Sequence, residues 1–138
     1  MTVAVNWRLA PPEMAYIVND SQATVLIVHE EFAEHLAAFR GDLEYVTTVV
    51  VVGDGGDDTS YAAWRDAHGP DCEKLPSADD DVSSQLYSSG TTGHPKGVQS
   101  TNANFQALFA TVDWDMGDDS RNMAILPFFH IGGGGWAL

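Results

Sequence analysis

The chain has 138 residues, of which 44% are hydrophobic and 19% charged, the composition of a soluble globular protein. Six Lys and Arg stand against twenty Asp and Glu, and the formal charge of −14 argues against nucleic acid or anionic lipid as a partner. Cys72 is the only cysteine, which excludes an internal disulfide and fits a cytoplasmic location. No apolar run approaches the ~20 residues of a membrane span, so no integral membrane segment is expected.

The first part of the chain alternates predicted helices and strands. Prolines in an opening turn predict a helix from Pro11 to the polar residues 19–21. The apolar run 24–28 predicts a strand covered on both faces, and the β-branched run 46–52 predicts a second buried strand. Between them, residues 30–40 predict a helix with Gly41 as its C-terminal cap. The apolar faces of the two helices comprise Met14, Ile17, Val18, Phe32, Leu36 and Phe39.

Residues 53–81 differ from the rest of the chain because they are strongly acidic. This stretch carries nine Asp and Glu residues and only a short helical piece, around residues 61–66. Calcium binding by its aspartate runs is an alternative, but neither run has the ligand spacing of an EF-hand loop. The stretch is therefore interpreted as solvated surface.

Order returns in the second half of the chain. Residues 82–87 and 97–100 predict strands on either side of a Gly/Ser/Thr loop, and residues 122–126 predict a final strand. Thr101 or Asn102 can cap a helix whose apolar side chains are expected in the core. Buried strands that alternate with helices indicate an α/β fold with a largely parallel sheet flanked by helices. The apolar residues of that helix are Phe105, Leu108, Phe109 and Val112.

The segment from Tyr87 to Gly97 concentrates glycines, hydroxyls and one lysine directly after a predicted strand. Glycines let backbone N–H groups form a concave anion site, the hydroxyls add donors or Mg²⁺ ligands, and Lys96 adds a compact positive charge. The segment is not a Walker A loop, because Pro95 precedes Lys96 and Gly97 follows it. On composition alone, an ordinary surface loop explains the segment as well as a phosphate site does.

The same segment, Tyr-Ser-Ser-Gly-Thr-Thr-Gly-His-Pro-Lys-Gly, resembles the signature loop of the AMP-forming adenylating enzymes. The common form of that loop has Thr at the position of Ser88, and His94 occupies its variable position. Residues 6–21 resemble the upstream "N-x-R-L" region of the family, and residues 126–133 resemble its downstream "L-P-x-F-H-x-x-G" motif. The resemblance spans the whole chain and is greatest to bacterial fatty-acyl-CoA synthetases.

This resemblance implies a ligase that joins a carboxylate, here a fatty acid, to the α-phosphate of ATP and passes the acyl group to coenzyme A. Lys96 and Thr91 would be catalytic, and Thr91 and Thr92 would contact the Mg²⁺ that ATP carries. The residues that would bind the ATP phosphates are Ser88, Ser89, Gly90, Thr91, Thr92, Gly93 and Lys96. The residues that would line the acyl pocket are His130, Gly132 and Gly133. Without the motif, His130 beside two phenylalanines fits an ordinary half-buried histidine.

The resemblance also sets expectations for domain organisation. Residues 1–138 would be an incomplete portion of the N-terminal AMP-binding domain, residues 53–81 an acidic surface insertion within it, and the C-terminal domain would be absent. The chain by itself is expected to be inactive and to aggregate. Three alternatives stay open: an adenylation domain that feeds a carrier protein, an aryl-CoA ligase, and a non-catalytic nucleotide-binding module.

Overall fold

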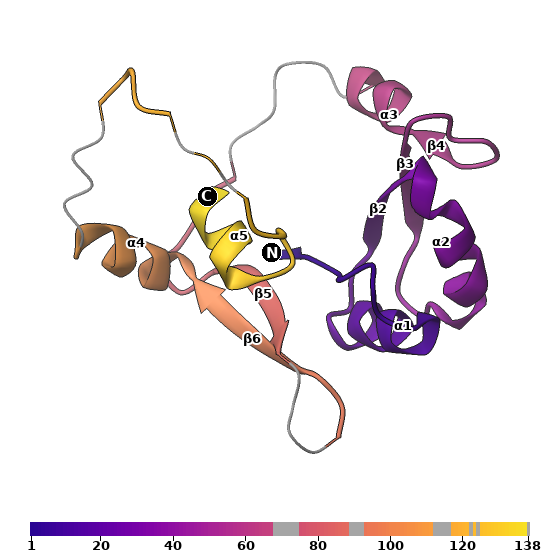
Figure 1. The fold of residues 1–138 in the computed structure, drawn as a ribbon, viewed down its shortest axis with the longest axis horizontal. Helices are drawn as coiled ribbons and strands as arrows, with labels where there is room; N and C mark the ends of the chain where they lie inside the picture. The colour runs from indigo at the N-terminus through magenta and orange to yellow at the C-terminus, as the bar shows by residue number, and fades with distance from the viewer. Residues whose placement is uncertain (68–74, 89–92, 112–116, 122, 124, 138) are drawn as a thin grey trace. The chain divides into compact units, whose positions relative to one another are not determined.

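The computed structural model describes residues 1–67, 75–88, 93–111, 117–121, 123 and 125–137 (Figure 1). The chain divides into two compact units, one formed by Val5–Leu75 and the other by Met1–Ala4 together with Pro76–Leu138. Both units combine a three-stranded sheet with helices, so the predicted α/β class is confirmed.

The unit Val5–Leu75 contains a parallel sheet in the order β2-β3-β4, formed by Val25–His29, Thr48–Val52 and Thr59–Ser60. Parallel pairing aligns Leu26 with Val49 and Ile27 with Val50. The two predicted strands are thus confirmed, with β3 beginning at Thr48 rather than at residue 46. The sequence did not predict β4, which is only two residues long.

Helices α1 (Pro11–Asp20) and α2 (Ala33–Phe39) bury their apolar sides against one face of this sheet. The core cluster contains Met14, Ala15, Leu36 and Phe39, with Leu26, Val28 and Val49 packed against it. On the opposite face Val50 is fully buried, whereas Val25 and Ile27 are 44% and 52% exposed. The prediction that both faces of β2 are covered is therefore wrong in the described structure.

The local signals at the helix ends explain where α1 begins and ends. Pro11 occupies the first turn, and the Glu13 carboxylate accepts the backbone N–H of Ala10 at 2.9 Å, which satisfies a free donor at the helix start. The helix ends at Asp20, followed by Ser21, as predicted. Residues 6–9, which precede α1, form a turn in which the Leu9 N–H donates to the Asn6 carbonyl at 3.2 Å.

The predicted helix over residues 30–40 is divided into three pieces. A 3-10 turn, η1 (Glu30–Phe32), precedes α2, and a second, η2 (Arg40–Asp42), follows it. Gly41 lies inside η2 and does not have the positive φ of a helix-capping glycine, so its predicted capping role is wrong. The acidic stretch that follows β3 carries β4 and α3 (Tyr61–Ala67), the latter close to its predicted position.

The second unit contains a sheet in the order β1-β5-β6, formed by Thr2–Val3, Val82–Ser88 and Lys96–Thr101. β1 runs parallel to β5, but β5 and β6 are antiparallel and lie side by side as a hairpin (Figure 1). The antiparallel pair departs from a fully parallel arrangement. Its physical reason is the connection 89–95, which is too short for the crossover that parallel strands need.

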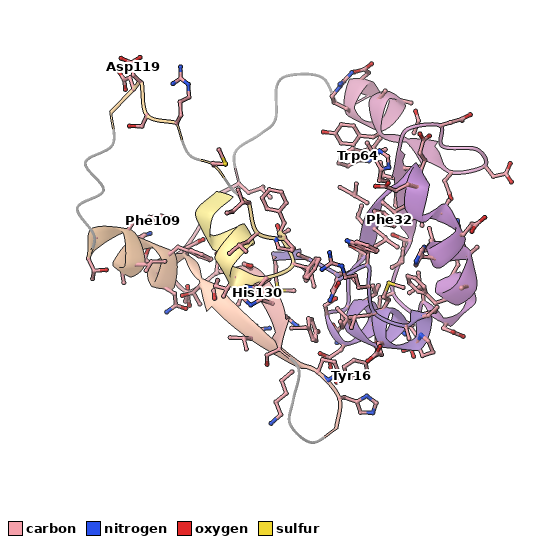
Figure 2. All side chains as sticks on the ribbon, in the orientation of Figure 1. Tyr16, Phe32, Trp64, Phe109, Asp119 and His130 are labelled. Atoms are coloured by element: carbon pink, nitrogen blue, oxygen red, sulfur yellow. The ribbon has the colours of Figure 1, made fainter. Side chains whose placement is uncertain are left out.

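Helix α4 (Asn102–Ala110) is capped by Thr101, one of the two residues predicted for that role, whose hydroxyl accepts the N–H of Asn104 in a capping box. Its apolar side chains are not core: Leu108 and Phe109 are 47% and 42% exposed, and Phe109 is labelled on α4 in Figure 2. Val112 lies outside the described residues.

The predicted strand over residues 122–126 is absent at its described positions. Met123 and Ile125 are 81% and 78% exposed, and neither pairs with a neighbouring strand in the described structure. The segment leads instead to helix α5 (Ile131–Ala137). No helix among the described residues has the length and apolarity needed to cross a membrane.

Candidate functional site

The β5–β6 hairpin frames the glycine- and hydroxyl-rich segment. Ser88, the last residue of β5, pairs directly with Lys96, the first residue of β6. The connection between them carries the remaining residues expected to bind phosphate. Of those, Gly93 is described, whereas Ser89, Gly90, Thr91 and Thr92 lie outside the described residues.

Lys96 is exposed at the start of β6. Within the described part of the chain its ammonium group takes part in no hydrogen bond or ion pair. Gly93 has a φ of +100°, a conformation that side-chain-bearing residues rarely adopt, and its surroundings are open. The described residues at the two ends of the loop thus include the Ser88 hydroxyl, the Lys96 ammonium group and a turn at Gly93 that depends on glycine.

Side chains on the two faces of the hairpin differ in character. Because side chains alternate along a strand, Lys96 and Ser88 share one face with Leu86 and Val98. The other face carries Gln85, Tyr87, Gly97 and Gln99. Sequence reasoning missed this second group. The available signal was the two-residue spacing of Gln85 and Tyr87 in a predicted strand, which places both on one face.

The second group of predicted residues lies just before and within α5. His130 precedes this helix, as labelled in Figure 2, and its Nδ1 accepts the backbone N–H of Gly132 at 3.1 Å. Because Nδ1 is an acceptor, the neutral ring carries its proton on Nε2. The side chain of His130 therefore caps the start of α5 and keeps a donor on its other nitrogen.

The glycines after His130 meet their own chain. A Cβ on Gly133 would collide with the backbone carbonyls of Leu126 and Pro127, and one on Gly132 would come within 2.8 Å of the Leu126 side chain. Gly133 therefore requires glycine for the close approach of backbone at the start of α5, whereas at Gly132 the Leu126 side chain could move aside. Their expected role in leaving room for an acyl chain stays a prediction.

Outside the β5–β6 hairpin and the start of α5, the described residues provide little evidence for a further metal or ligand site. No group of three or more His, Cys, Asp and Glu side chains is placed there to hold a metal ion. A cleft of about 380 Å³ occurs in the unit Val5–Leu75, lined by polar groups that include Arg40, Asp57 and Asp58. It contains none of the residues predicted to bind ATP or substrate.

Comparison with known proteins assigns the whole chain to one family. The family described as AMP-binding enzyme matches residues 1–138. The fatty acid–acyl-carrier-protein ligase ScoC of Streptomyces coeruleorubidus is 36% identical over 98% of this chain and 26% of its own length. The 3-hydroxybenzoate–CoA/4-hydroxybenzoate–CoA ligase of Thauera aromatica is 39% identical over 71% of this chain and 19% of its own length.

A solved structure agrees with these relatives. The crystal structure of the anthranilate CoA ligase AuaEII in complex with anthranoyl-AMP superposes with a TM-score of 0.70 at 38% identity, over 79% of this chain and 21% of the other. The chain thus spans about a quarter or less of the length of each relative.

Proposed function

Because this chain belongs to the AMP-binding enzyme family, we propose that it forms the ATP phosphate-binding part of an acid–thiol ligase. The ligase activates a carboxylate with ATP, releases pyrophosphate and transfers the acyl group from the acyl-adenylate to coenzyme A. Residues 1–138 form part of its AMP-binding domain, with residues 53–81 as an acidic surface insertion. The proposed location is the cytoplasm.

This proposal rests on one observation: Lys96 pairs directly with Ser88, and this pair closes the loop of residues 89–95 that belongs to the motif. Phosphoryl and adenylyl transfer depend mainly on positioning and on stabilisation of the charge that develops on the leaving group. A lysine without an ion-pair partner among the described residues is suited to that role, because its charge is not already offset.

The net charge of the chain makes this local arrangement necessary. The ligand is a polyanion, whereas the chain carries a formal charge of −14. Much of the acidity lies in residues 53–81 and 113–119, outside the loop. Backbone N–H groups, hydroxyls and Lys96 therefore have to attract the phosphates at short range, where individual donors outweigh a screened net charge.

Mg²⁺ would enter with ATP. The described residues form no acidic cage for it, and the hydroxyls of Thr91 and Thr92 are oxygen ligands of the kind Mg²⁺ accepts. When bound, the ion neutralises charge on the phosphate oxygens. Thr91 is also proposed to contact the reacting phosphates, together with the loop residues Ser89, Gly90 and Gly93.

His130 is proposed to contact the carboxylate substrate or the adenylate. Its Nδ1 is engaged by Gly132, so Nε2–H is the donor available to an anionic group. Gly132 and Gly133 are proposed to let the acyl chain approach the start of α5.

A fatty acid is the proposed substrate, by similarity to the fatty acid ligase from S. coeruleorubidus. An aromatic acid is the second candidate, because the hydroxybenzoate and anthranilate CoA ligases are 39% and 38% identical to this chain. Transfer to an acyl-carrier protein is the alternative to coenzyme A, since the ligase from S. coeruleorubidus is named for that acceptor.

Acid-dependent exchange of labelled pyrophosphate into ATP tests this function. The natural gene product that contains this chain should catalyse exchange with fatty acids of some chain length, and benzoate-type acids should be poorer. Coenzyme A and acyl-carrier protein are then compared as acceptors. Exchange with none of the acids would overturn the proposal, and preferred exchange with benzoate-type acids would select the aromatic candidate.

The 138-residue chain by itself should show no thioester formation. Coenzyme A-dependent pyrophosphate release from ATP and a fatty acid by the purified chain would contradict that expectation. Binding of phosphate ligands without exchange in the natural gene product would instead favour a non-catalytic nucleotide-binding module.

A further inference from the structure

A hydrogen-bonded cluster occupies the face of the β5–β6 hairpin opposite Lys96. Gln85 is only 5% exposed, and its amide is satisfied in both directions. Its Nε2 donates to the Tyr87 hydroxyl at 2.7 Å, and its Oε1 accepts from Gln99 Nε2 at 3.2 Å. A buried amide is costly unless such bonds are made, so the hairpin is favoured in the arrangement that keeps all three side chains together.

Gly97 makes room for this cluster. It pairs directly with Tyr87, and a Cβ added to it would overlap the Gln85 amide and come within 3.1 Å of the Tyr87 ring. If β6 slipped by one residue, Lys96 or Val98 would stand where glycine is needed. A side chain at the position opposite Tyr87 would therefore displace the Gln85 amide from its hydrogen bond with Tyr87.

Register decides which face of the hairpin Lys96 occupies. Because side chains alternate along a strand, a slip of one residue turns every side chain of β6 to the other face. In the observed register Lys96 lies across from Ser88, beside the loop. β5 already contains a register shift between Val82 and Ser84, so pairing along this hairpin is not uniform.

We propose that Gln85 and Tyr87, closed over Gly97, are positioning residues that hold the β5–β6 register and so present Lys96 to the phosphates. This inference rests on the proposed function for its ligand, but the register itself does not depend on any ligand. In this proposal the two residues act through Lys96, whose side chain lies on the other face of the hairpin, and need no contact of their own with ATP or the acid.

A disulfide between β5 and β6 can report the register of the two strands in the absence of any ligand. Leu86 and Val98 pair directly, and residues opposite each other in antiparallel strands have Cα separations that a disulfide can span. We would replace both by cysteine in a Cys72→Ser chain, which removes the chain's own thiol. The fraction oxidised is then measured with and without Gln85→Leu or Tyr87→Phe.

Both substitutions should lower the cross-linked fraction. Tyr87→Phe keeps the ring and removes one hydrogen bond, so it serves where Gln85→Leu perturbs folding. Gln106→Leu is the matched control, because Gln106 lies on α4 and bonds to Asp79 away from the hairpin. An unchanged cross-linked fraction in both hairpin variants would overturn the proposed positioning role.

Binding of magnesium tripolyphosphate to the natural gene product that contains this chain supplies the second measurement. Gln85→Leu should weaken binding by about tenfold, the value of one lost charge-assisted contact, and Tyr87→Phe by about fivefold. In a Lys96→Met background neither should weaken it further, because both act through Lys96. Additive losses in that background would contradict positioning through Lys96.

The two measurements separate the two proposals. If the unsubstituted gene product does not bind tripolyphosphate, the proposed phosphate site is wrong, while the cross-linked fraction still decides whether Gln85 and Tyr87 hold the register. If it binds and the cross-linked fraction is insensitive to both variants, the positioning role fails and the phosphate site stands.

Discussion

Arg40 and Asp58 form a bidentate ion pair in which the guanidinium Nη1 and Nη2 each donate to a different carboxylate oxygen at 2.6 Å. Arg40 is the first residue of η2, and Asp58 immediately precedes β4. The ion pair therefore links η2 to the acidic stretch of residues 53–81. Hydrogen bonding to Arg40 lowers the pKa of the Asp58 carboxyl below its ordinary value, and the same bond raises the pKa of Arg40.

This ion pair should make the free energy of unfolding decrease as the pH falls into the acid range. The folded-state pKa of Asp58 lies below its ordinary value of 3.8, so the stabilisation is complete above pH 3.8 and is lost as the pH falls through the folded-state pKa. Asp58→Asn should cost about 1 kcal/mol or less at neutral pH, because the Arg40 side chain is 49% exposed. Urea unfolding from neutral to acid pH measures the difference.

The control for this prediction is Asp66→Asn, which removes the exposed pair between adjacent Arg65 and Asp66. It should have a smaller effect, because both of its partners are more than half exposed. A difference between Asp58→Asn and the unsubstituted chain that stays constant below pH 3.8 would contradict the assignment.

Replacing Lys96 by alanine should slow adenylate formation in the natural gene product. Loss of one cation at the leaving pyrophosphate should raise the barrier by roughly 2–4 kcal/mol, by analogy with loss of an oxyanion donor. Arg121→Ala is the charge-matched control, because Arg121 bonds only to neighbouring backbone carbonyls among the described residues. Pyrophosphate exchange measures both variants, and an unchanged rate for Lys96→Ala would remove Lys96 from the mechanism.

Elements with strong local signals were predictable from sequence. Pro11 and Glu13 fix the start of α1 through backbone geometry and a capping hydrogen bond, and Thr101 with Asn104 does the same for α4. The strands β2 and β3 followed from continuous apolar and β-branched runs. These signals act within a few residues, so no knowledge of the rest of the fold was needed.

The misjudged features depend on contacts between distant residues. Whether Leu108, Phe109 or Ile27 is buried depends on what packs against them, and their apolar character does not reveal it. Met123 and Ile125 suit a strand, but a strand also needs a neighbour to pair with. Gln85 escaped notice because its role appears only when β6 brings Gln99 and Gly97 beside it.

Gly133→Ala should destabilise the start of α5. The added methyl group would overlap the carbonyls of Leu126 and Pro127, so the turn must open, at a cost of about 1–3 kcal/mol. Gly117→Ala is the matched control, because a Cβ there meets nothing within 4 Å and its φ is not positive. Urea unfolding compares the two variants. Equal free energies of unfolding would show that the close backbone contact at Gly133 does not contribute to stability.

Ile27→Lys should reduce self-association of the chain while leaving its hydrophobic core folded. Val25 and Ile27 are 44% and 52% exposed on β2, which is one of the two edge strands of its described sheet. An uncharged apolar edge strand is a template for pairing with another chain, and a lysine on it opposes that pairing. Sedimentation velocity should show aggregates for the unsubstituted chain and mainly monomer for Ile27→Lys.

The opposite face of the same strand provides the control for that prediction. Leu26→Lys places the same charge against the core cluster around Met14 and Leu36, so it should unfold the unit rather than solubilise it. The two adjacent positions thus separate an edge effect from a change in net charge, which is identical in both variants. A monomeric unsubstituted chain with a cooperative thermal transition would contradict the prediction, because the exposed face of β2 would then carry no tendency to associate.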